Sequence, residues 1–395
     1  MSNLPKHSGL SSPSNAAPRI VVVSGNKFHA YHLARGVHRA GWLHRFVTTI
    51  FDRREAGIPA EKIIQVPAPA YAAMLIARLP FPDSQIWSYY VGDNWFDRAA
   101  SRYASEADIY HAFNHHGLHG MRKAKQNGAI TIVERSSAHP NVQHSLLREE
   151  FERFGLRYPA GNKRIIAKHV QEYAEANWIM VASEFVHRTM VAQGVPAAKL
   201  RSVHLGFSPE HFYLGEKPDS IFRVIFVGAL SLQKGLPYLL EGFKLAQLPP
   251  DRSELLLVGE PFPEAHTFLP KYAGLYRHLR FVPHTELAQV YHTGSVFALP
   301  SLQDGFGMVV YEAAACGLPI LISENVGATI RDGEDGFVVP IRDTEAIAEK
   351  LIYFYNHEAD RQRMGRSAGE YVSQFTWARY QDQLISHYQE IWHSR

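Results

Sequence analysis

The sequence has almost no cysteine, no long apolar run and no marked excess of charge of one sign. Cys316 is the only cysteine among 395 residues, which excludes an intramolecular disulfide and a zinc site built from cysteines. No stretch approaches about 18 consecutive apolar residues, and the Ser-, Asn- and Pro-rich start has no apolar core, so neither a membrane span nor a secretory signal is evident. We therefore expect a cytoplasmic location, or one at the inner face of the membrane.

The nearly balanced charge argues against a further class of protein, the nucleic-acid binders. Lys and Arg number 41 against 38 Asp and Glu, a net charge of +3, which argues against a nucleic-acid partner. The 22 histidines add positive charge as the pH falls through about 6.5, which is compatible with anionic ligands or an anionic membrane surface. An apolar fraction of 46% with only 20% charged residues predicts well-packed globular domains.

Strand-like apolar runs alternate with helix-compatible segments in two successive series. The runs of the first series are 20–25, 109–113, 129–133 and 178–182, and those of the second are 222–228, 254–259, 279–282, 296–299 and 319–323. Such alternation predicts α/β architecture with two doubly wound, Rossmann-like parallel sheets facing a central cleft, where the ligand is expected.

This pattern divides the chain into four predicted parts. They are a disordered tail at 1–18, an N-terminal acceptor-side domain at 19–210, a nucleotide-sugar-binding domain at 211–375 and a helix at 376–395. Apolar residues spaced by four along the last segment make one helical face, which we expect to pack back on the N-terminal domain. A membrane-lying helix is the alternative.

The most informative segment runs from Pro300 to Pro319. Here a strand ends, Gly305 and Gly307 turn the chain, and a helix begins whose free amides and dipole form an anion site. Asp304 precedes the turn and Glu312 lies two turns into the helix, so both carboxylates can reach one cleft and hold sugar hydroxyls. The alternative is that Asp304 only caps the helix and Glu312 faces solvent.

This segment resembles the signature of the family 4 glycosyltransferases, retaining enzymes of the GT-B fold whose hallmark is two glutamates separated by seven residues. Asp304 replaces the first glutamate, and Glu312 matches the second. The resemblance implies that Glu312 holds the ribose hydroxyls and Asp304 the donor sugar. It also implies that sugar and phosphate are held by the backbone amides that follow Gly305, those of Phe306, Gly307 and Met308.

A second motif, Gly228 to Gly235, follows a predicted strand and precedes a predicted helix, a context suited to gripping phosphate. It is similar to the family's diphosphate loop, which implies that Lys234 stabilises the departing nucleoside diphosphate without a metal. Many members have an arginine where this chain has Ala229, so either Ser231 and backbone amides assist Lys234 or another cation does. A solvated surface lysine is the alternative.

Two positions in the first domain complete the predicted site. His139 follows a strand and a polar loop, and looks like the family's histidine that contacts the donor sugar; a plain loop histidine is the alternative. Gly25 occupies the place of the family's glycine-bearing loop, where donor and acceptor meet. The motif G-x-G-x-x-G is missing there, which argues against a nicotinamide enzyme.

Two further clusters leave alternatives open. The histidines at 111, 115, 116 and 119 could place two imidazoles on one helical face as metal ligands, could make the acceptor side polar, or could be plain loop residues, and we predict no metal. The basic segment from Lys27 to Arg54 could contact anionic lipid or a phosphorylated acceptor, or could be a solvated face.

The sequence thus predicts a retaining, metal-independent hexosyltransferase without a bound cofactor. Its donor is predicted to be a UDP-sugar or a GDP-sugar, and its acceptor a hydroxyl of a glycan or a lipid-linked molecule in bacterial surface polysaccharide or lipopolysaccharide synthesis. Another GT-B enzyme, either an epimerase or a phosphorylase, and a non-catalytic sugar-nucleotide binding subunit are the alternatives.

Overall fold

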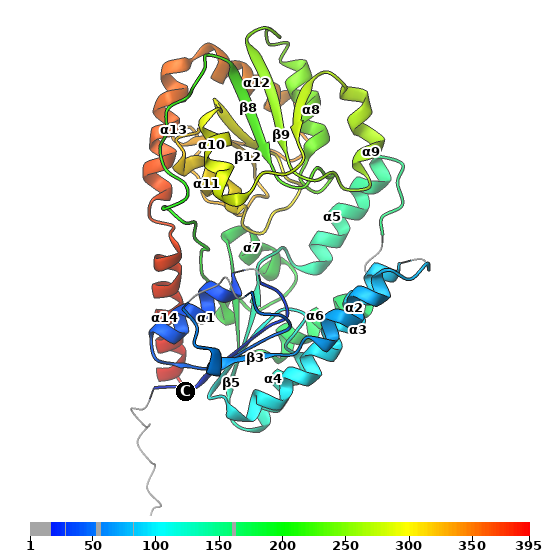
Figure 1. Ribbon diagram of the computed structural model, residues 1–395, viewed down its shortest axis with the longest axis vertical. Coiled ribbons are helices and arrows are strands. Elements are labelled where there is room, and N and C mark those ends of the chain that lie inside the picture. Colours follow the sequence, from blue (N-terminus) through cyan, green and yellow to red (C-terminus); the bar gives the residue numbers. More distant parts are fainter. Residues whose placement is uncertain (1–16, 28, 53–56, 82, 160–162) are drawn as a thin grey trace, which may run out of the picture.

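The computed structural model describes residues 17–27, 29–52, 57–81, 83–159 and 163–395, which form two α/β domains, one above the other in Figure 1. The first has a seven-stranded sheet in the order β3-β2-β1-β4-β5-β6-β7, and the second a six-stranded sheet in the order β10-β9-β8-β11-β12-β13. All of these strand pairs are parallel. The predicted fold class is confirmed. Residues 1–16 of the predicted tail lie outside the described residues.

The strands of the first domain are β1 (Ile20–Ser24), β2 (Leu43–Thr48), β3 (Ile63–Gln65), β4 (Ile109–Phe113), β5 (Ile130–Arg135), β6 (Trp178–Val181) and β7 (Leu200–Ser202). Those of the second are β8 (Phe222–Val227), β9 (Ser253–Val258), β10 (Tyr276–Leu279), β11 (Val296–Leu299), β12 (Ile320–Ser323) and β13 (Gly336–Val339). The central strands β1 and β8 are buried along their whole length, which explains their unbroken apolar runs.

The helices of the first domain are α1 (Ala30–Arg39), α2 (Ala68–Ala77), α3 (Ser84–Ala100), α4 (Leu118–Gln126), α5 (Pro140–Arg153), α6 (Lys163–Glu175) and α7 (Glu184–Ala192). Those that follow are α8 (Leu236–Leu245), α9 (Ala265–Phe268), α10 (Leu287–His292), α11 (Met308–Ala315), α12 (Thr344–Asn356), α13 (Glu358–Val372) and α14 (Trp377–His393). Short 3-10 turns lie at Ala60–Lys62, Ser101–Glu106, Ala197–Lys199, Leu269–Tyr272 and His284–Glu286.

The predicted strand at 279–282 is wrong in its position. The strand in this place is β10 (Tyr276–Leu279), an edge strand with polar residues Arg277 and His278, whereas Phe281 beyond it is 81% exposed. The apolar residues Phe281 and Val282 follow the strand, and the strand itself can be polar because an edge strand needs no continuous apolar run.

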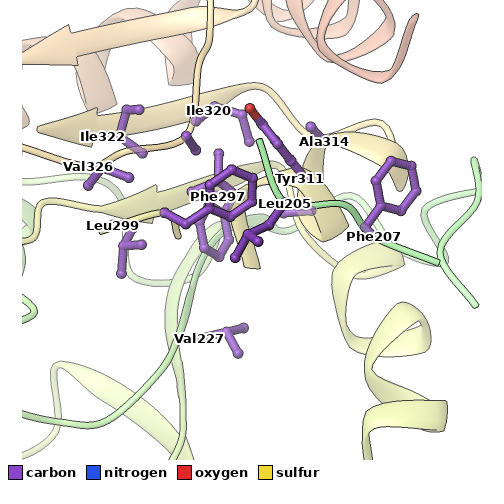
Figure 2. Close-up of a cluster of buried hydrophobic side chains, with 14 of the residues drawn as sticks. Leu205, Phe207, Val227, Phe297, Leu299, Tyr311, Ala314, Ile320, Ile322 and Val326 are labelled. Carbon is purple, nitrogen blue, oxygen red and sulfur yellow. The ribbon is translucent and has the colours of Figure 1, made fainter. Parts of the chain in front are cut away.

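The chain crosses between the domains twice at one place. After β7, Leu205 and Phe207 enter the buried cluster that also holds Phe297 and Tyr311 of the second domain (Figure 2). The backbone amide of Phe207 donates to the carbonyl of Phe375, on the returning chain, at 3.0 Å. Both crossings are therefore fastened to each other and to the core of the second domain.

After the second crossing, α14 runs back along the first domain beside α1 (Figure 1). The Gln381 amide donates to the carbonyl of His32 at 2.9 Å, and the Tyr388 hydroxyl lies 2.5 Å from Nδ1 of His111. Its apolar face, with Tyr380 and Leu384, is buried inside the molecule, which leaves that face no role at a membrane. Among the described residues, no helix combines the length and the apolar character that crossing a bilayer requires.

Candidate functional site

The motifs identified in the sequence follow strands of the two sheets. The loop 228–235 comes after β8, the loop 300–307 after β11, the loop 136–139 after β5, and Gly25 after β1. Because the strands are parallel, these loops gather at the carboxyl edges of their sheets, where open α/β folds bind ligands. The predicted donor-binding residues of both domains therefore lie on the edges that can meet at one cleft.

Lys234 and Asp304, one from each motif of the second domain, form an ion pair. Lys234 Nζ lies 2.5 Å from Asp304 Oδ2, and the two side chains are 21% and 14% exposed. The two loops approach closely because Gly235, at φ +65°, has no side chain: a Cβ there would lie 1.8 Å from the carbonyl oxygen of Pro300. Lys234 is therefore a partly covered cation beside the signature, not a solvated surface lysine.

The signature turns into α11 through Gly307, which adopts a left-handed conformation at φ +76°. No side chain caps this helix, which leaves the amides of its first turn without a side-chain acceptor. The amide of Phe306 donates weakly to Asp304 Oδ1 at 3.4 Å, while its ring is buried against Tyr311. Asp304 thus faces both Lys234 and the turn, and Met308 is half-buried at the start of the helix.

Glu312 is buried on α11 and its carboxylate has two partners. His284 Nε2 lies 3.1 Å from Oε1, and the Tyr291 hydroxyl donates to Oε2 at 3.3 Å. The hydrogen bond to Glu312 raises the pKa of His284, although burial opposes the shift. Glu312 therefore does not face solvent, and each of its oxygens retains capacity to accept from a ribose hydroxyl. Sequence reasoning missed His284 and Tyr291, which lie outside any motif; only their place after an edge strand could have indicated them.

Gly305 is where the first domain meets the signature. A Cβ on Gly305 would lie 1.9 Å from the carbonyl oxygen of Ser136, and the Ser183 hydroxyl donates to the Gly305 carbonyl at 2.6 Å. Beside it, the Ser137 hydroxyl lies 3.3 Å from Oε1 of the buried Gln303. Gln303, which sequence reasoning also missed, is a polar residue directly before Asp304. The structure therefore brings the loop after β5 against the loop after β11.

His139 is buried at the N-terminus of α5. Its Nδ1 accepts from the amide of Asn141 at 3.3 Å, and its own backbone amide donates to the Thr189 hydroxyl at 3.0 Å. Burial, reinforced by the charge of Arg135, lowers the pKa of His139 to about 4. The ring is therefore neutral near pH 7, and its accepting Nδ1 leaves the proton on Nε2, where it can donate to a ligand hydroxyl.

Gly25 is held between two side chains of the first domain. Its amide donates to His116 Nδ1 at 3.2 Å, and its carbonyl accepts from the Thr49 hydroxyl at 2.6 Å. A Cβ at Gly25 would lie 2.7 Å from His116 Nε2, which itself lies 3.3 Å from Asp93 Oδ1. Gly25 therefore allows the loop after β1 to rest directly on the histidine.

The histidine segment does not form one helical face. His111 lies on β4 between Glu134 and Tyr388, His115 contacts Asp93 and His169, and His119 lies on α4. Within the part of the chain that the structure describes, no three His, Cys, Asp or Glu side chains are grouped to hold a metal ion. The imidazoles of His111 and His115 are thus partners of carboxylates within the first domain, and His115 also contacts His169.

A cleft of about 760 Å³ opens between the domains beside the loop 228–235. It contains Ser231, which is buried, but not Lys234, Asp304 or Glu312. Its lining residues come from α3, α5, α9 and the loops after α5, β8 and β9, and include Gln85, Leu147, Phe151, Leu156, Arg157 and Phe262. The cleft therefore joins residues of the first domain to the loop 228–235 of the second.

The basic segment of the first domain is largely neutralised by carboxylates. Lys27 lies 3.0 Å from Asp52, and Arg39 lies 3.0 Å from Asp382 of α14. His44 and Arg45 both contact Glu106, and His32 stacks on Trp377. Arg53 and Arg54 lie outside the described residues. The predicted cationic surface is therefore weaker than the sequence indicated.

Comparison with known proteins identifies the class. Residues 221–357 match the family described as Glycosyl transferases group 1. A D-inositol 3-phosphate glycosyltransferase of Kribbella flavida is 25% identical over 296 residues, which are 68% of each chain. The enzyme of the same name from Corynebacterium diphtheriae is 34% identical over 175 residues, 41% of each chain, so the match spans well under two thirds of that relative.

Solved structures match over the whole fold. A sucrose-phosphate synthase from Thermosynechococcus elongatus has a TM-score of 0.69 at 19% identity, covering 95% of this chain and 100% of that one. HepE of Anabaena, solved in complex with UDP-glucose, has a TM-score of 0.67 at 15% identity, covering 94% and 100%. The architecture is GT-B. Its second domain, which carries Lys234, Asp304 and Glu312, is a group 1 glycosyl transferase domain, and the family resemblance is confirmed.

Proposed function

We propose that the protein is a retaining, metal-independent hexosyltransferase that moves a sugar from a nucleoside diphosphate sugar to an acceptor hydroxyl. The observation that carries this proposal is the pairing of Lys234 with Asp304 at the carboxyl edge of the second sheet, directly before the helix that carries Glu312. A cation next to an uncapped helix start suits a diphosphate, and two carboxylates suit the hydroxyls of a sugar and a ribose.

Each residue has a role in this proposal. Lys234 stabilises the negative charge that develops on the departing diphosphate, with Ser231 and the amides after Gly305. Glu312 accepts hydrogen bonds from the ribose, Asp304 from the donor sugar, and His139 donates to the sugar through Nε2. Closure of the first domain on the signature excludes water from the sugar.

The proposed reaction proceeds on one face of the sugar. The bond from the anomeric carbon to the phosphate oxygen breaks, the bond to the acceptor oxygen forms, and the acceptor proton passes to the leaving phosphate. Both carboxylates are already engaged, Asp304 by Lys234 and Glu312 by His284 and Tyr291, which favours recognition of substrate over nucleophilic attack.

For the substrates, UDP-sugars are the first donors to test because HepE was solved with UDP-glucose. We propose a glycan or lipid-linked acceptor, in bacterial surface polysaccharide or lipopolysaccharide synthesis on the cytoplasmic side of the membrane. D-inositol 3-phosphate, named for the relatives, is the second acceptor to test.

The test combines binding with turnover. Thermal unfolding is measured with UDP, GDP and ADP and their sugars, with and without EDTA, and release of nucleoside diphosphate is followed with each acceptor. We expect one base to raise the melting temperature regardless of EDTA, with release only when an acceptor is present. Lys234→Ala should strongly reduce both effects, whereas Lys244→Ala, an exposed lysine on α8, should leave both unchanged.

Three outcomes contradict the proposal. Release that requires a metal contradicts metal independence. Donor isomerisation or phosphorolysis without an acceptor indicates an epimerase or a phosphorylase. Tight donor binding without turnover on any acceptor indicates a non-catalytic binding subunit.

A further inference from the structure

The helical hairpin formed by α2 and α3 carries an unusual concentration of exposed apolar side chains. Of the 17 large hydrophobic residues that are exposed in the described chain, eight lie on this hairpin. They are Tyr71, Met74, Leu75, Leu79, Phe81, Trp87, Tyr89 and Trp95, with exposures from 38% to 65%. Single exposed apolar residues are ordinary, but a gathered set indicates an interaction surface.

The helix α2 shows this concentration of exposed apolar side chains most clearly. Its ten residues include no charged side chain, and it packs along α3 at the margin of the first domain (Figure 1). Tyr71, Met74 and Leu75, at spacings of three and four, form an outward stripe that continues to Arg78. The outward stripe of a helix that faces only water is normally polar, so this stripe is suited to a less polar surrounding.

The side-chain composition of the hairpin indicates what kind of partner it fits. Trp87, Tyr89 and Trp95 combine large apolar rings with a polar tip, which is the composition of side chains that lie at the interface of a bilayer. Arginines border the patch: Arg78 continues the stripe, and Arg157, 83% exposed, lies near the tip of the hairpin 3.8 Å from Asp83. Apolar side chains bordered by cations match an anionic lipid surface.

We propose that the α2–α3 hairpin docks the protein on an anionic bilayer by placing its exposed aromatic and aliphatic side chains in the headgroup region. This surface differs from the basic segment at Lys27 to Arg54, whose described residues include one exposed large apolar side chain, that of Ile50, against eight on the hairpin. The partner is the lipid surface itself, and a second copy of the chain is the competing occupant that the experiment separates.

Docking through the hairpin would also bring one side of the interdomain cleft near the bilayer. Gln85, which lies on α3 between the exposed Phe81 and Trp87 in sequence, also lines the 760 Å³ cleft, as does Ser231 of the loop 228–235. A lipid-linked acceptor leaving the bilayer beside the hairpin would enter a cleft with apolar walls at Leu147 and Phe262. This consequence rests on the proposed function, whereas the docking itself does not.

The test uses the whole protein with vesicles. Sedimentation is measured with vesicles of phosphatidylcholine alone and of phosphatidylcholine with phosphatidylglycerol, at low and high salt. The variant Met74→Ser/Leu75→Ser/Trp87→Ser removes three exposed side chains, and the control Val191→Ser/Leu245→Ser changes apolar side chains of comparable exposure, 42% and 43%, on other helices. We expect binding to the anionic vesicles, a loss of about tenfold or more in the triple variant, and no change in the control.

The remaining outcomes overturn the proposal. These are no binding of the unchanged protein to anionic vesicles, equal loss in the control, or full binding by the triple variant. A triple variant that turns a dimer into a monomer, in a protein that ignores vesicles, assigns the surface to a second copy. Donor-induced thermal stabilisation is measured in the same variants. It should remain unchanged, which separates failure of docking from failure of the proposed function and shows that the variants are folded.

Discussion

Lys234 Nζ and Asp304 Oδ2 lie 2.5 Å apart although 70 residues separate them in the chain. The cation expected to meet the donor diphosphate is therefore already held by the carboxylate that stands in place of the family's first glutamate. With Ala229 at the position of the usual arginine, Lys234 is the principal side-chain cation of the two motifs. Asp304 both positions this charge and partly neutralises it.

This pairing predicts opposite effects on binding from two substitutions. Lys234→Ala should weaken binding of nucleoside diphosphate and lower kcat by about 100-fold, because it removes charge stabilisation of the leaving group. Asp304→Asn should tighten binding of the diphosphate, because Lys234 is no longer neutralised, yet lower turnover through the lost contact with the sugar. Calorimetric titration and initial rates measure both, with Lys244→Ala as control. Unchanged affinity in Asp304→Asn would contradict the assigned pairing.

Much of this site could be predicted from the sequence because its residues lie in two short motifs. The turn at Gly305 and Gly307 and the loop ending at Gly235 have local signals, namely glycines between an apolar run and a helix. His284, Tyr291 and Gln303 have none. They reach the site through the edge of the second sheet and the contact between domains, and such distant contacts depend on topology that periodicity does not encode.

Gly305 should tolerate no side chain. A Cβ would lie 1.9 Å from the Ser136 carbonyl, and the neighbour is backbone that cannot rotate away. Gly305→Ala should therefore separate the loops of the two domains and lower turnover strongly, with a smaller effect on the melting temperature of each domain. Gly274→Ala provides a control, since a Cβ there meets nothing within 4 Å, although its φ of +85° adds some backbone strain. Normal turnover in Gly305→Ala would show that the domains need not meet here.

His139 combines two functions that substitution can separate. Its Nδ1 caps α5, so His139→Ala should destabilise the protein by about 1 kcal/mol in addition to any catalytic effect. His139→Asn keeps an oxygen that can cap the helix but shortens the reach into the cleft. We expect near-normal stability and reduced turnover in the asparagine variant. Urea denaturation and initial rates distinguish the two, and normal rates in both variants would leave His139 with capping alone.

Acid should destabilise the protein at a pH at which most carboxylates are still charged. Burial lowers the pKa of His139 to about 4 and that of His32 to about 3, and it lowers the pKa of His169 far below its usual value. Unfolded histidines take up protons near pH 6.5, so between about pH 6.5 and 4 the unfolded state binds more protons and the free energy of unfolding falls as the pH drops. Urea denaturation at pH 7.5, 6 and 5 measures this fall.

His284 should make the free energy of unfolding change with pH in the opposite direction. Because its hydrogen bond to Glu312 raises the pKa of His284, that pair contributes stability that is fully present below about pH 6.5 and is lost as the pH rises through the raised value. His284→Gln should therefore cost more stability at pH 6 than at pH 8, and His139→Asn should flatten the acid side of the profile. A profile that is flat from pH 7.5 to 5 in the unchanged protein would contradict the neutral state of the buried histidines.

The edges of the first sheet show where sequence reasoning fails for the fold. Strand β2, which lies between β1 and the edge strand β3, contains His44 and Arg45, whose side chains contact Glu106 and interrupt the apolar pattern. Strands β3 and β7 have three residues each, too few for any periodicity. Central strands are buried on both faces and have unbroken apolar runs, whereas edge strands obtain their stability from one neighbour and need no such run.

A buried ion pair fastens the domains beside the cleft. Glu150 of α5 is fully buried, and it accepts from Arg342 Nε at 2.7 Å and from the Tyr238 hydroxyl at 2.6 Å, both in the second domain. Arg342 adopts φ +66°, a strained conformation for a residue with a side chain, which the contact with Glu150 helps to hold.

Removing one partner of the Glu150–Arg342 pair should lower the free energy of unfolding far more than removing one partner of an exposed ion pair. Arg342→Ala leaves the Glu150 carboxylate short of a charge partner in a buried place, so we expect a loss of about 3 kcal/mol in the free energy of unfolding. Double-mutant cycles in urea compare Glu150→Gln with Arg342→Ala, and Arg39→Ala with Asp382→Ala, a pair that is 60% and 70% exposed. The first cycle should give a coupling above about 1 kcal/mol and the second below about 0.5 kcal/mol. Equal couplings would mean that contacts such as that of Gly305 with Ser136, and not this ion pair, hold the domains together.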